Sequence, residues 1–503
     1  MIIRTALILA CAALLRGEGL PLPDAPLRLV IPDVRAFDKA LSGPYRQFLE
    51  GSLSQNDPML AAWKRTRLGS KLDSQWAAFS DKVSLDWRTL KVMQPSSVGL
   101  ALLDAGHLEA VLIIETPLSL ASLSLPKGAM KNHNGVSYTL IAEGAADDSG
   151  DKHERMGFAW AGMGNKLIFA SSERAMKLAL DAALSNISYT IPLEGLACLD
   201  LNLDELRRDI YFKREFPFPK GTETGRLYAA LRRQGGNLVE VRQGTGESRS
   251  PVFKFEADNA AIAGWEPDGG NFWPTFRRAL LDTEPNPSSK PVPALRPLPS
   301  TAGALDSYLV DFTKPATGRG SEAWEEGDLT TWTSLLADVS SYGYSSHRAG
   351  QRILVFPWPK AKDAPFMDAC LASMARRHGM VSVARIGDIQ EIQAGPGLPV
   401  LAVRRTGAFL WVAARADHLS RVTEPQPESA LIRWAKLDLN AVRAEESRWN
   451  KIEGPSAPEY DRPLSDRLLG LLGWMPNAAR ISVERRKTTD NGWIEKVVFG
   501  GGD

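Results

Sequence analysis

The chain has 503 residues, of which 44% are hydrophobic and 24% charged, with 60 lysines and arginines against 59 aspartates and glutamates. This composition is typical of globular proteins and excludes a chain that is mostly disordered. The formal charge of +1 excludes the strongly basic character of most nucleic-acid-binding proteins, so no nucleic-acid partner is expected. The length predicts about two to four domains.

The N-terminal residues are typical of an export signal. Residues 5–15 form an apolar run that is too short to cross a bilayer but long enough for the core of a signal peptide. Gly17 and Gly19 supply the small residues that cleavage after Gly19 requires. We therefore predict a signal peptide over residues 1–19 and export to the periplasm or the extracellular space, with no transmembrane span.

The three cysteines bear on this location. Cys11 ends a stretch that resembles a bacterial lipobox, so lipid anchoring at Cys11 is the alternative to a soluble exported protein. Cys198 lies in a strand pattern, and Cys370 lies on the apolar face of a predicted helix. Buried, unreactive thiols are expected at both positions. An oxidising compartment would permit a bridge between them, which the sequence leaves open.

Periodicity, caps and turn residues predict the elements of the first half of the chain. The chain opens with a strand at 27–34, a helix at 34–41 capped by Asp33, and further helix through Trp63 and Trp76. Hairpins follow at 98–115 and 135–161, then a strand and helix at 167–170 and 173–183, and a second strand and helix at 197–201 and 203–212. The last predicted elements are a helix at 226–233 and closing strands at 237–242 and 253–257. Antiparallel hairpins with helices between them predict an α+β fold, with helices packed on a mainly antiparallel sheet.

The second half of the chain repeats the pattern of the first. Leu-Asp-Leu-Asn occurs at residues 199–202 and again at 437–440. Other segments match in the same order and at offsets of 241 to 244: 98–113 with 342–357, 166–172 with 408–414, 226–231 with 467–472, 237–242 with 479–484, and 253–257 with 494–499. Near the start of the chain, 27–34 also resembles 305–312. The series predicts two diverged, pseudo-symmetric copies of one α+β unit.

A proline-rich segment suggests where the copies divide. Residues 284–300 contain six prolines, which are incompatible with a helix interior or a central strand. We therefore predict a first repeat with a connector at 20–283, a linker at 284–300 and a second repeat at 301–503. The connector is rich in aromatic residues, which either pack against the repeats or form a ligand platform; they are Trp265, Phe272, Trp273 and Phe276.

The repeated tetrapeptide has a structural and a functional interpretation. Its leucines point to one face of a strand, and Asn202 is placed to cap the following helix, with Glu205 completing a capping box. The functional alternative is that the equivalent carboxylates Asp200 and Asp438 face one cleft.

No motif assigns a catalytic, cofactor-binding or metal-binding residue. The six histidines show no metal-ligand spacing, and His378 is expected to lie at a helix C-terminus, where a cation is favoured. The acidic segment 147–151 lacks the pattern of a calcium loop. Ser124 and Lys127 have the spacing of a Ser-x-x-Lys pair, but Pro126 between them disrupts the helix which that motif needs.

Three segments together resemble a group of exported bacterial proteins of unknown function. They are LRLVIPDVRAF from residue 27, SGPYRQFLEG from residue 42, and GFAWAGMGNKLIFASSERAMKLAL from residue 157. The resemblance implies the same duplicated architecture, and it transfers no catalytic residue and no cofactor.

The sequence therefore predicts an exported cell-envelope protein that is non-enzymatic and binds a protein or small-molecule partner, in a groove between the copies. Its ligand-binding residues stay unassigned. One alternative is a hydrolase whose carboxylates form no local motif. The other is a structural module of an envelope assembly.

Overall fold

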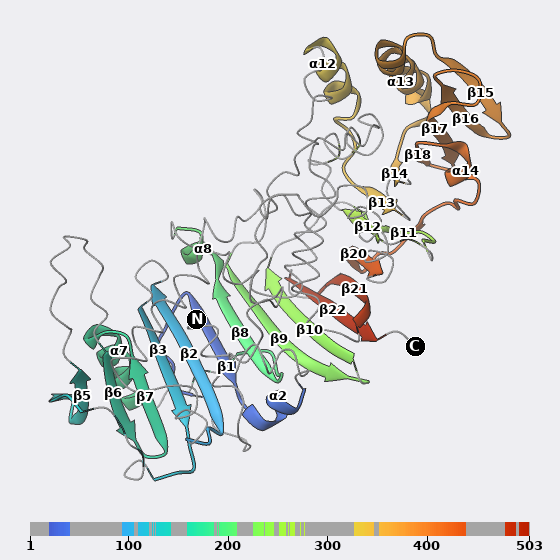
Figure 1. Ribbon diagram of the computed structural model, residues 1–503. Helices are drawn as coiled ribbons and strands as arrows, with labels where there is room; N and C mark the ends of the chain where they lie inside the picture. The colour runs from blue at the N-terminus through green and yellow to red at the C-terminus, as the bar shows by residue number, and fades with distance from the viewer. Residues whose placement is uncertain are drawn as a thin grey trace, which may run out of the picture. The chain divides into compact units, whose positions relative to one another are not determined.

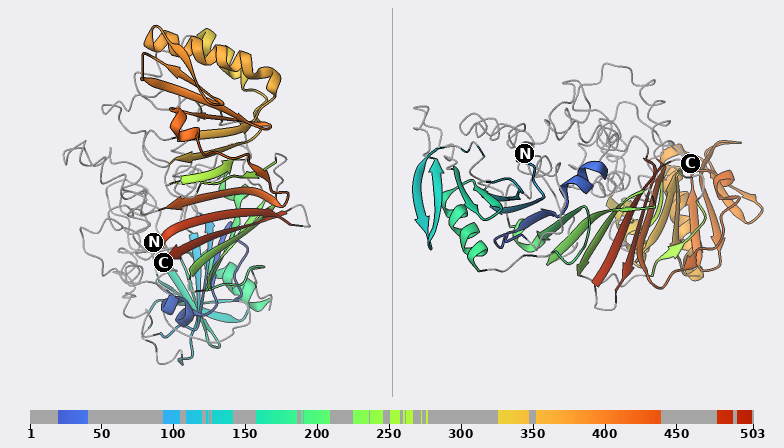
Figure 2. Two further views of the ribbon diagram at one scale, coloured as in Figure 1. Left: turned by 90° about the vertical axis from the view of Figure 1, so that its right-hand side faces the viewer. Right: turned by 90° about the horizontal axis from the view of Figure 1, so that it is seen from below.

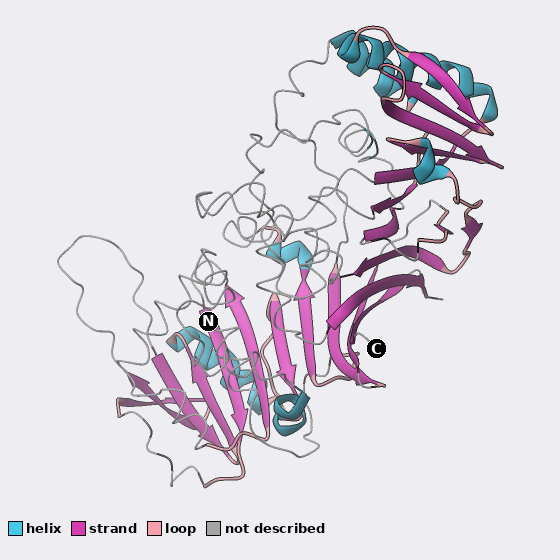
Figure 3. Ribbon diagram, turned by 45° about the vertical axis from the view of Figure 1, so that its right-hand side comes forward, coloured by secondary structure: helices cyan, strands magenta, loops and turns pink. Residues whose placement is uncertain are grey.

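The computed structural model describes residues 20–40, 93–104, 109–119, 123, 125, 127–141, 158–185, 189, 191–208, 225–235, 237–245, 251–257, 260, 262–266, 272, 276, 326–346, 352–438, 478–488 and 492–501. The predicted signal peptide, the helices through Trp63 and Trp76, and the proline-rich linker lie outside these residues. Described residues up to 245 belong to one compact unit and those from 251 onward to another (Figure 1). Strands account for 50% of the structure and helices for 20%, so the fold is mainly antiparallel β (Figure 3).

Ten described strands belong to the first unit, and every neighbouring pair runs antiparallel. They are β1 (Leu27–Ile31), β2 (Ser97–Asp104), β3 (Glu109–Glu115), β4 (Ala129–His133), β5 (Val136–Ile141), β6 (Phe158–Met163), β7 (Lys166–Ala170), β8 (Ala197–Asn202), β9 (Arg226–Gln234) and β10 (Asn237–Thr245). Their spatial order is β4-β5-β6-β7-β3-β2-β1-β8-β9-β10. The two predicted hairpins are confirmed as β2–β3 and β5–β6.

Three described helices accompany these strands, and their caps follow from the sequence. In α2 (Val34–Ala40) the Asp33 carboxylate accepts a hydrogen bond from the Ala36 amide, as predicted. The hydroxyl of Ser172 caps α7 (Glu173–Leu184) in the same way, at the Ala175 amide. Asn202 caps the short α8 (Leu203–Leu206), as predicted.

Helix α7 covers one face of the strands around β3, β6 and β7 (Figure 2). Its apolar face packs on alternate residues of those strands, which belong to the same buried cluster. Leu20 and Leu22 complete this cluster and are almost fully buried. The chain that follows the predicted cleavage site is therefore part of the folded core.

Tight turns join the strands at one end of this unit. Asn134 and Gly135 both have positive φ and form a type I′ turn between β4 and β5. Gly164 alone has positive φ in the Gly164-Asn165 turn between β6 and β7, which is therefore type II′. Each two-residue turn fixes the register of its hairpin.

Ten main strands of the described second unit also form an antiparallel array. They are β12 (Ile262–Glu266), β13 (Tyr342–Ser346), β14 (Arg352–Pro357), β15 (Ser382–Ile386), β16 (Ile389–Gln393), β17 (Pro399–Thr406), β18 (Phe409–Ala413), β20 (Leu431–Asp438), β21 (Ala478–Lys487) and β22 (Gly492–Gly501). Their spatial order is β15-β16-β17-β18-β14-β13-β12-β20-β21-β22. A short separate ladder pairs β11 (Phe253–Lys254) with β19 (Gln426–Pro427).

The helical segments with described bounds in this unit are α12 (Glu326–Leu335), the 3-10 turn η5 (Lys360–Lys362), α13 (Asp363–His378) and α14 (Ala416–Leu419). Helices α12 and α13 lie side by side, and the Trp332 indole donates a hydrogen bond to the Ser373 hydroxyl between them (Figure 2). Helix α13 ends at Gly379, as predicted, and Cys370 is buried on its apolar face.

Strand for strand, the two units have the same pairing order. The array from β4 to β10 corresponds to the array from β15 to β22, and α7 and α14 follow equivalent strands. The sequence matches at β2–β3 with β13–β14 and at β7 with β18 agree with this order. The match of residues 199–202 with 437–440, in β8 and β20, agrees as well. The match of 27–34 with 305–312 does not, because β12 is the counterpart of β1. The match of 237–242 with 479–484 also fails, because β22 and not β21 is the counterpart of β10.

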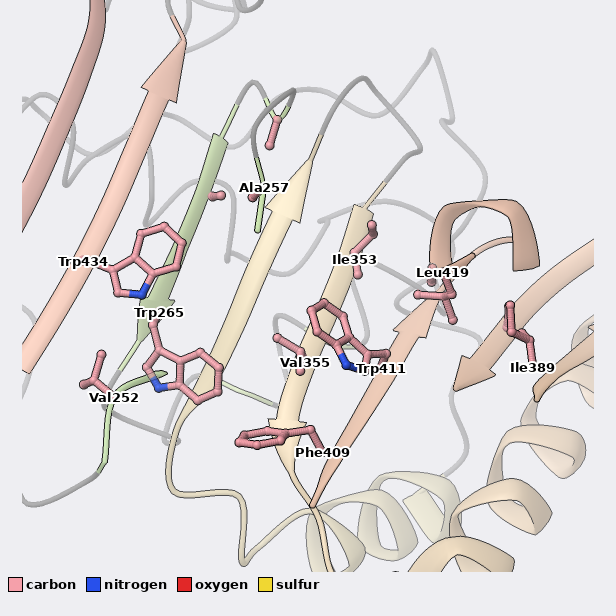
Figure 4. Packing of buried hydrophobic residues seen from close by; sticks show 14 of the residues in the cluster. Val252, Ala257, Trp265, Ile353, Val355, Ile389, Phe409, Trp411, Leu419 and Trp434 are labelled. Carbon is pink, nitrogen blue, oxygen red and sulfur yellow. The ribbon is translucent and has the colours of Figure 1, made fainter. Parts of the chain in front are cut away.

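Aromatic side chains form the core of the second unit. Trp265, Phe409, Trp411 and Trp434 are buried in one cluster on the face that α14 covers (Figure 4). Gly343 makes room for this packing, because a Cβ at that position would lie 2.7 Å from the Trp265 ring. The remaining rings, including Phe272 and Phe276, pack between the strands and the two longer helices.

Two sequence expectations need correction. Residues 226–233, predicted to be a helix, form β9, which pairs with β8 and β10. The Ala-Ala-Leu stretch favours a helix by propensity, but pairing on both sides overrides it, and Gly235 provides the hairpin turn.

Strand β12, assigned by sequence to the first repeat, lies between β13 and β20 of the second unit. The unit boundary is therefore near residue 246, upstream of the proline-rich segment.

Candidate functional site

Asp200, a candidate from the sequence, lies in the middle of the first unit's strands. It is on β8, directly opposite Arg28 of β1 and Tyr228 of β9. Its side chain is completely buried. Because a buried carboxylate needs cationic or hydrogen-bonding partners, its surroundings decide whether it can react with a ligand.

Two arginines hold the Asp200 carboxylate. Arg28 donates from Nε at 3.1 Å and from Nη2 at 2.7 Å to Oδ2, and Arg226 donates from Nη1 to the same oxygen at 2.7 Å. The other ends of both guanidinium groups meet Asp24, at 3.3 Å from Arg28 and 3.1 Å from Arg226. The four side chains thus form a closed ring of two cations and two anions.

Tyr189 completes the cluster. Its hydroxyl donates a hydrogen bond to Asp200 Oδ2, and the Arg28 guanidinium stacks 3.5 Å from the centre of its ring. Burial, followed by the hydrogen bond to Asp200, raises the pKa of Tyr189 well above its usual value. The pKa of Arg226 is also raised, because the hydrogen bond to Asp24 and the charge of Asp200 outweigh desolvation.

This arrangement ties four parts of the first unit together but leaves a substrate no access to the Asp200 carboxylate. The ring joins β1, β8 and β9 to the segment that contains Asp24, and Asp200 is not exposed to solvent. Within the described chain, Asp200 Oδ1 has no hydrogen-bond partner, but it is sealed in the same interior. A structural role for Asp200 follows.

Asp438, the equivalent residue of the second unit, is in different surroundings. It lies on β20 opposite Arg480, with its Oδ2 4.0 Å from Arg480 Nε, and its side chain is 33% exposed. Because the Asp200 side chain is completely buried, the hypothesis that Asp200 and Asp438 face one cleft is wrong for Asp200.

The described first unit has an accessible hollow at the end of β5, β6 and β7. Its volume is about 550 Å³, within the range of small-ligand sites. The strands line it with Val136, Ser137, Gly162, Met163 and Ile168 among others, and Ala183 of α7 and Pro21 close it off. These strands and α7 are neighbours at one end of the unit in Figure 1.

The hollow exists because β5 and β6 separate before they reach their turns. They pair at three positions, from Ile141–Phe158 to Thr139–Trp160. The same register would place Ser137 opposite Gly162, but that pair does not form. In the described chain the ladder between these strands therefore stops two residues short of that position.

The turn geometry shows where the backbone groups at this opening point. A two-residue turn makes its flanking residues a hydrogen-bonded pair, so Val136 bonds to β4 and Met163 to β7. Their neighbours Ser137 and Gly162 then direct their amide and carbonyl groups toward each other across the opening. Both residues are exposed, so these groups are accessible to a ligand.

The equivalent strands of the second unit are closed. Strands β16 and β17 pair from Gln393–Pro399 to Ile389–Arg404, so the ladder reaches the first residue after the β15–β16 turn. Gln390, the counterpart of Ser137 relative to the turn, pairs with Val403. The open ladder is thus a difference between two units of the same topology.

The cysteines and the histidine described next make structural contacts. Cys198 and Cys370 are buried free thiols, and burial raises the pKa of the Cys198 thiol to about 11. His133 lies 2.7 Å from Asp181 of α7, in a contact exposed to solvent. In the described chain, no cluster of three or more His, Cys, Asp or Glu side chains is arranged to hold a metal ion. None of the helices described has the length and apolarity of a membrane-spanning helix.

Sequence reasoning missed the hollow. The available signals were the Asn134-Gly135 hairpin turn and a glycine, Gly162, inside a strand, which often marks the close approach of another backbone. The place where a ladder opens depends on the register between strands that are far apart in sequence. The chain matches no protein-family model, and no curated protein and no solved structure is significantly similar to it.

Proposed function

We propose that this chain is an exported, non-enzymatic binding protein of the cell envelope, and that its first unit binds an extended peptide in the hollow between β5 and β6. The observation that carries the proposal is the open ladder, with the backbone groups of Ser137 and Gly162 facing each other and exposed. A peptide strand supplies amide and carbonyl groups at the spacing needed to complete such a ladder.

The apolar lining supports a peptide over a small polar molecule. Four backbone hydrogen bonds contribute roughly 2–6 kcal/mol net, which is of the order of the cost of association. Binding therefore needs apolar burial as well. Val136 and Met163, which are half-buried on the α7 face, line the hollow and offer such burial.

The duplication fits this proposal. The shared strand order supports two diverged copies of one ancestral unit, one with a closed ladder and one with an open ladder. The apolar run ahead of residue 20 supports export, because cleavage after Gly19 would leave Leu20, a buried core residue, as the new N-terminus.

The test uses the chain from residue 20 to 503 and a display library of heptapeptides. We expect enriched peptides to bind and to protect the amides of residues 136–141 and 158–163 from hydrogen exchange. Ser137→Pro removes one donor at the opening and leaves the β4–β5 ladder intact, so it should weaken binding about tenfold or more with little loss of stability.

Gln390→Pro in the closed unit is the matched control. It removes an amide within a formed ladder, so we expect a destabilisation of the second unit by about 3 kcal/mol and no effect on peptide binding. Failure to enrich any peptide, or protection confined to other strands, would rule out the proposed site.

A structural role in an envelope assembly is the second candidate, and one observation favours it. Most of the strongly exposed large apolar side chains of the second unit gather around β15, which pairs with β16 alone in the described chain. These are Met380, Val383, Ile386 and Leu398. Exposed apolar edge strands promote association, so Ile386→Lys should lower any self-association seen by sedimentation velocity. A monomer at all concentrations before mutation would contradict this candidate.

A further inference from the structure

Among the described residues that line the hollow, one has a charged side chain. Lys166 begins β7, directly after the β6–β7 turn, and pairs with Met163 of β6 and Glu115 of β3. It lies on the same face as Ile168, two residues along the strand, and that face is the one covered by α7.

Lys166 has no ion-pair partner within the described chain, although an acid lies opposite it. The Glu115 carboxylate is engaged elsewhere: Ser97 Oγ donates to Oε2 at 2.8 Å, and Asn165 Nδ2 donates to Oε1 at 2.8 Å. The C-terminus of α7 contributes a partial negative charge of about half a unit near Ala183, less than the full charge of the ammonium group. Glu115 keeps its negative charge but does not line the hollow, so Lys166 carries the one full charge among the described lining residues.

The second unit, in which the equivalent ladder is closed, has a different residue at the position of Lys166. The first residue after the equivalent β17–β18 turn is Phe409, which is buried and packs edge-on against Trp265 and Phe253. In the first unit the same place on the same face is taken by a lysine beside an open ladder. Replacing a core aromatic residue with a cation gains no packing, so the lysine is better explained by a ligand.

We infer that the ligand is an extended peptide bearing a carboxylate, which pairs with the Lys166 ammonium group while the peptide backbone completes the β5–β6 ladder. This inference rests on the proposed peptide-binding function and specifies its ligand class. The carboxylate is the C-terminus of the peptide or an Asp or Glu side chain, and the two sources share the same chemistry at Lys166.

The test compares matched synthetic peptides made from the enriched sequences. Each is prepared with a free C-terminus, with a C-terminal amide, and with each Asp or Glu replaced by its amide, and is titrated by calorimetry. We expect the removal of one carboxylate to weaken binding about tenfold or more, and the change responsible identifies its source. Lys166→Gln should abolish this difference and Lys166→Arg should retain most of it.

Lys177→Gln is the control, because Lys177 lies on α7, pairs with Glu173 and does not line the hollow. It should leave both affinities unchanged. If all forms of a peptide bind equally and Lys166→Gln has no effect, the carboxylate inference is overturned while peptide binding stands. If no peptide protects β5 and β6, the proposed function fails, and this inference with it.

Discussion

The ring around Asp200 makes a strong prediction, because the second unit supplies its own control. Replacing Asp200 by Asn removes one anion and leaves Arg28, which is only 5% exposed, with Asp24 as its one carboxylate partner. Breaking a buried ion pair from one side costs about 3–5 kcal/mol. We expect the lower end, about 3 kcal/mol, because Asn keeps an oxygen that accepts a hydrogen bond.

The measurement is native-state hydrogen exchange read by mass spectrometry, which reports on each unit separately. A loss of 3 kcal/mol corresponds to faster exchange by on the order of 100-fold in peptides from β1, β8 and β9. Asp438→Asn is the matched change in the second unit. Its side chain is a third exposed and 4.0 Å from Arg480, so the loss should stay within about 0–1 kcal/mol.

Equal effects of the two substitutions would refute the reasoning, since they would show that the buried Arg28–Asp200 pair contributes no more than an exposed pair. A large effect of Asp200→Asn on β4 to β7 alone would also contradict it. Those strands hold the hollow and lie away from the ring in the pairing order.

Three further predictions concern the described side chains. Hydrogen bonds from Lys131, then Lys177 and Tyr138, lower the pKa of Glu173 to about 2. The Glu173 carboxylate therefore stabilises the first unit fully above about pH 4.5, and this stabilisation is lost as the pH falls toward 2. Glu173→Gln should make the stability of the first unit less dependent on pH in that range. Burial, then the hydrogen bond to Glu173, raises the pKa of Tyr138 to about 12, and ultraviolet titration of Tyr138→Phe should lose one high-pH phenol. Gly343→Ala should destabilise the second unit by about 1–3 kcal/mol in urea, because its Cβ would meet the ring of Trp265; an unchanged midpoint would contradict that packing.

Local signals in the sequence predicted much of the fold. Caps at Asp33 and Asn202 and the hairpins β2–β3 and β5–β6 depend on residues close together in the chain, and the structure confirms them. Strand β9 was missed because Ala, Leu and Arg favour helix unless neighbouring strands pair with them. Strand β12 was misassigned because it is five residues long and its partners lie about 80 and 170 residues away.

The sequence did not predict the candidate site, for a related reason. A hollow between two strands depends on where their ladder ends, and a sequence pattern that predicts both strands does not fix that position. The sequence match aligned Lys166 with Ala408, whereas the turns and the pairing with β3 and β14 align it with Phe409. A shift of one residue moves every side chain of a strand to the opposite face. With the correct register, Lys166 replaces a buried aromatic residue, and only then does its position beside the open ladder indicate a ligand.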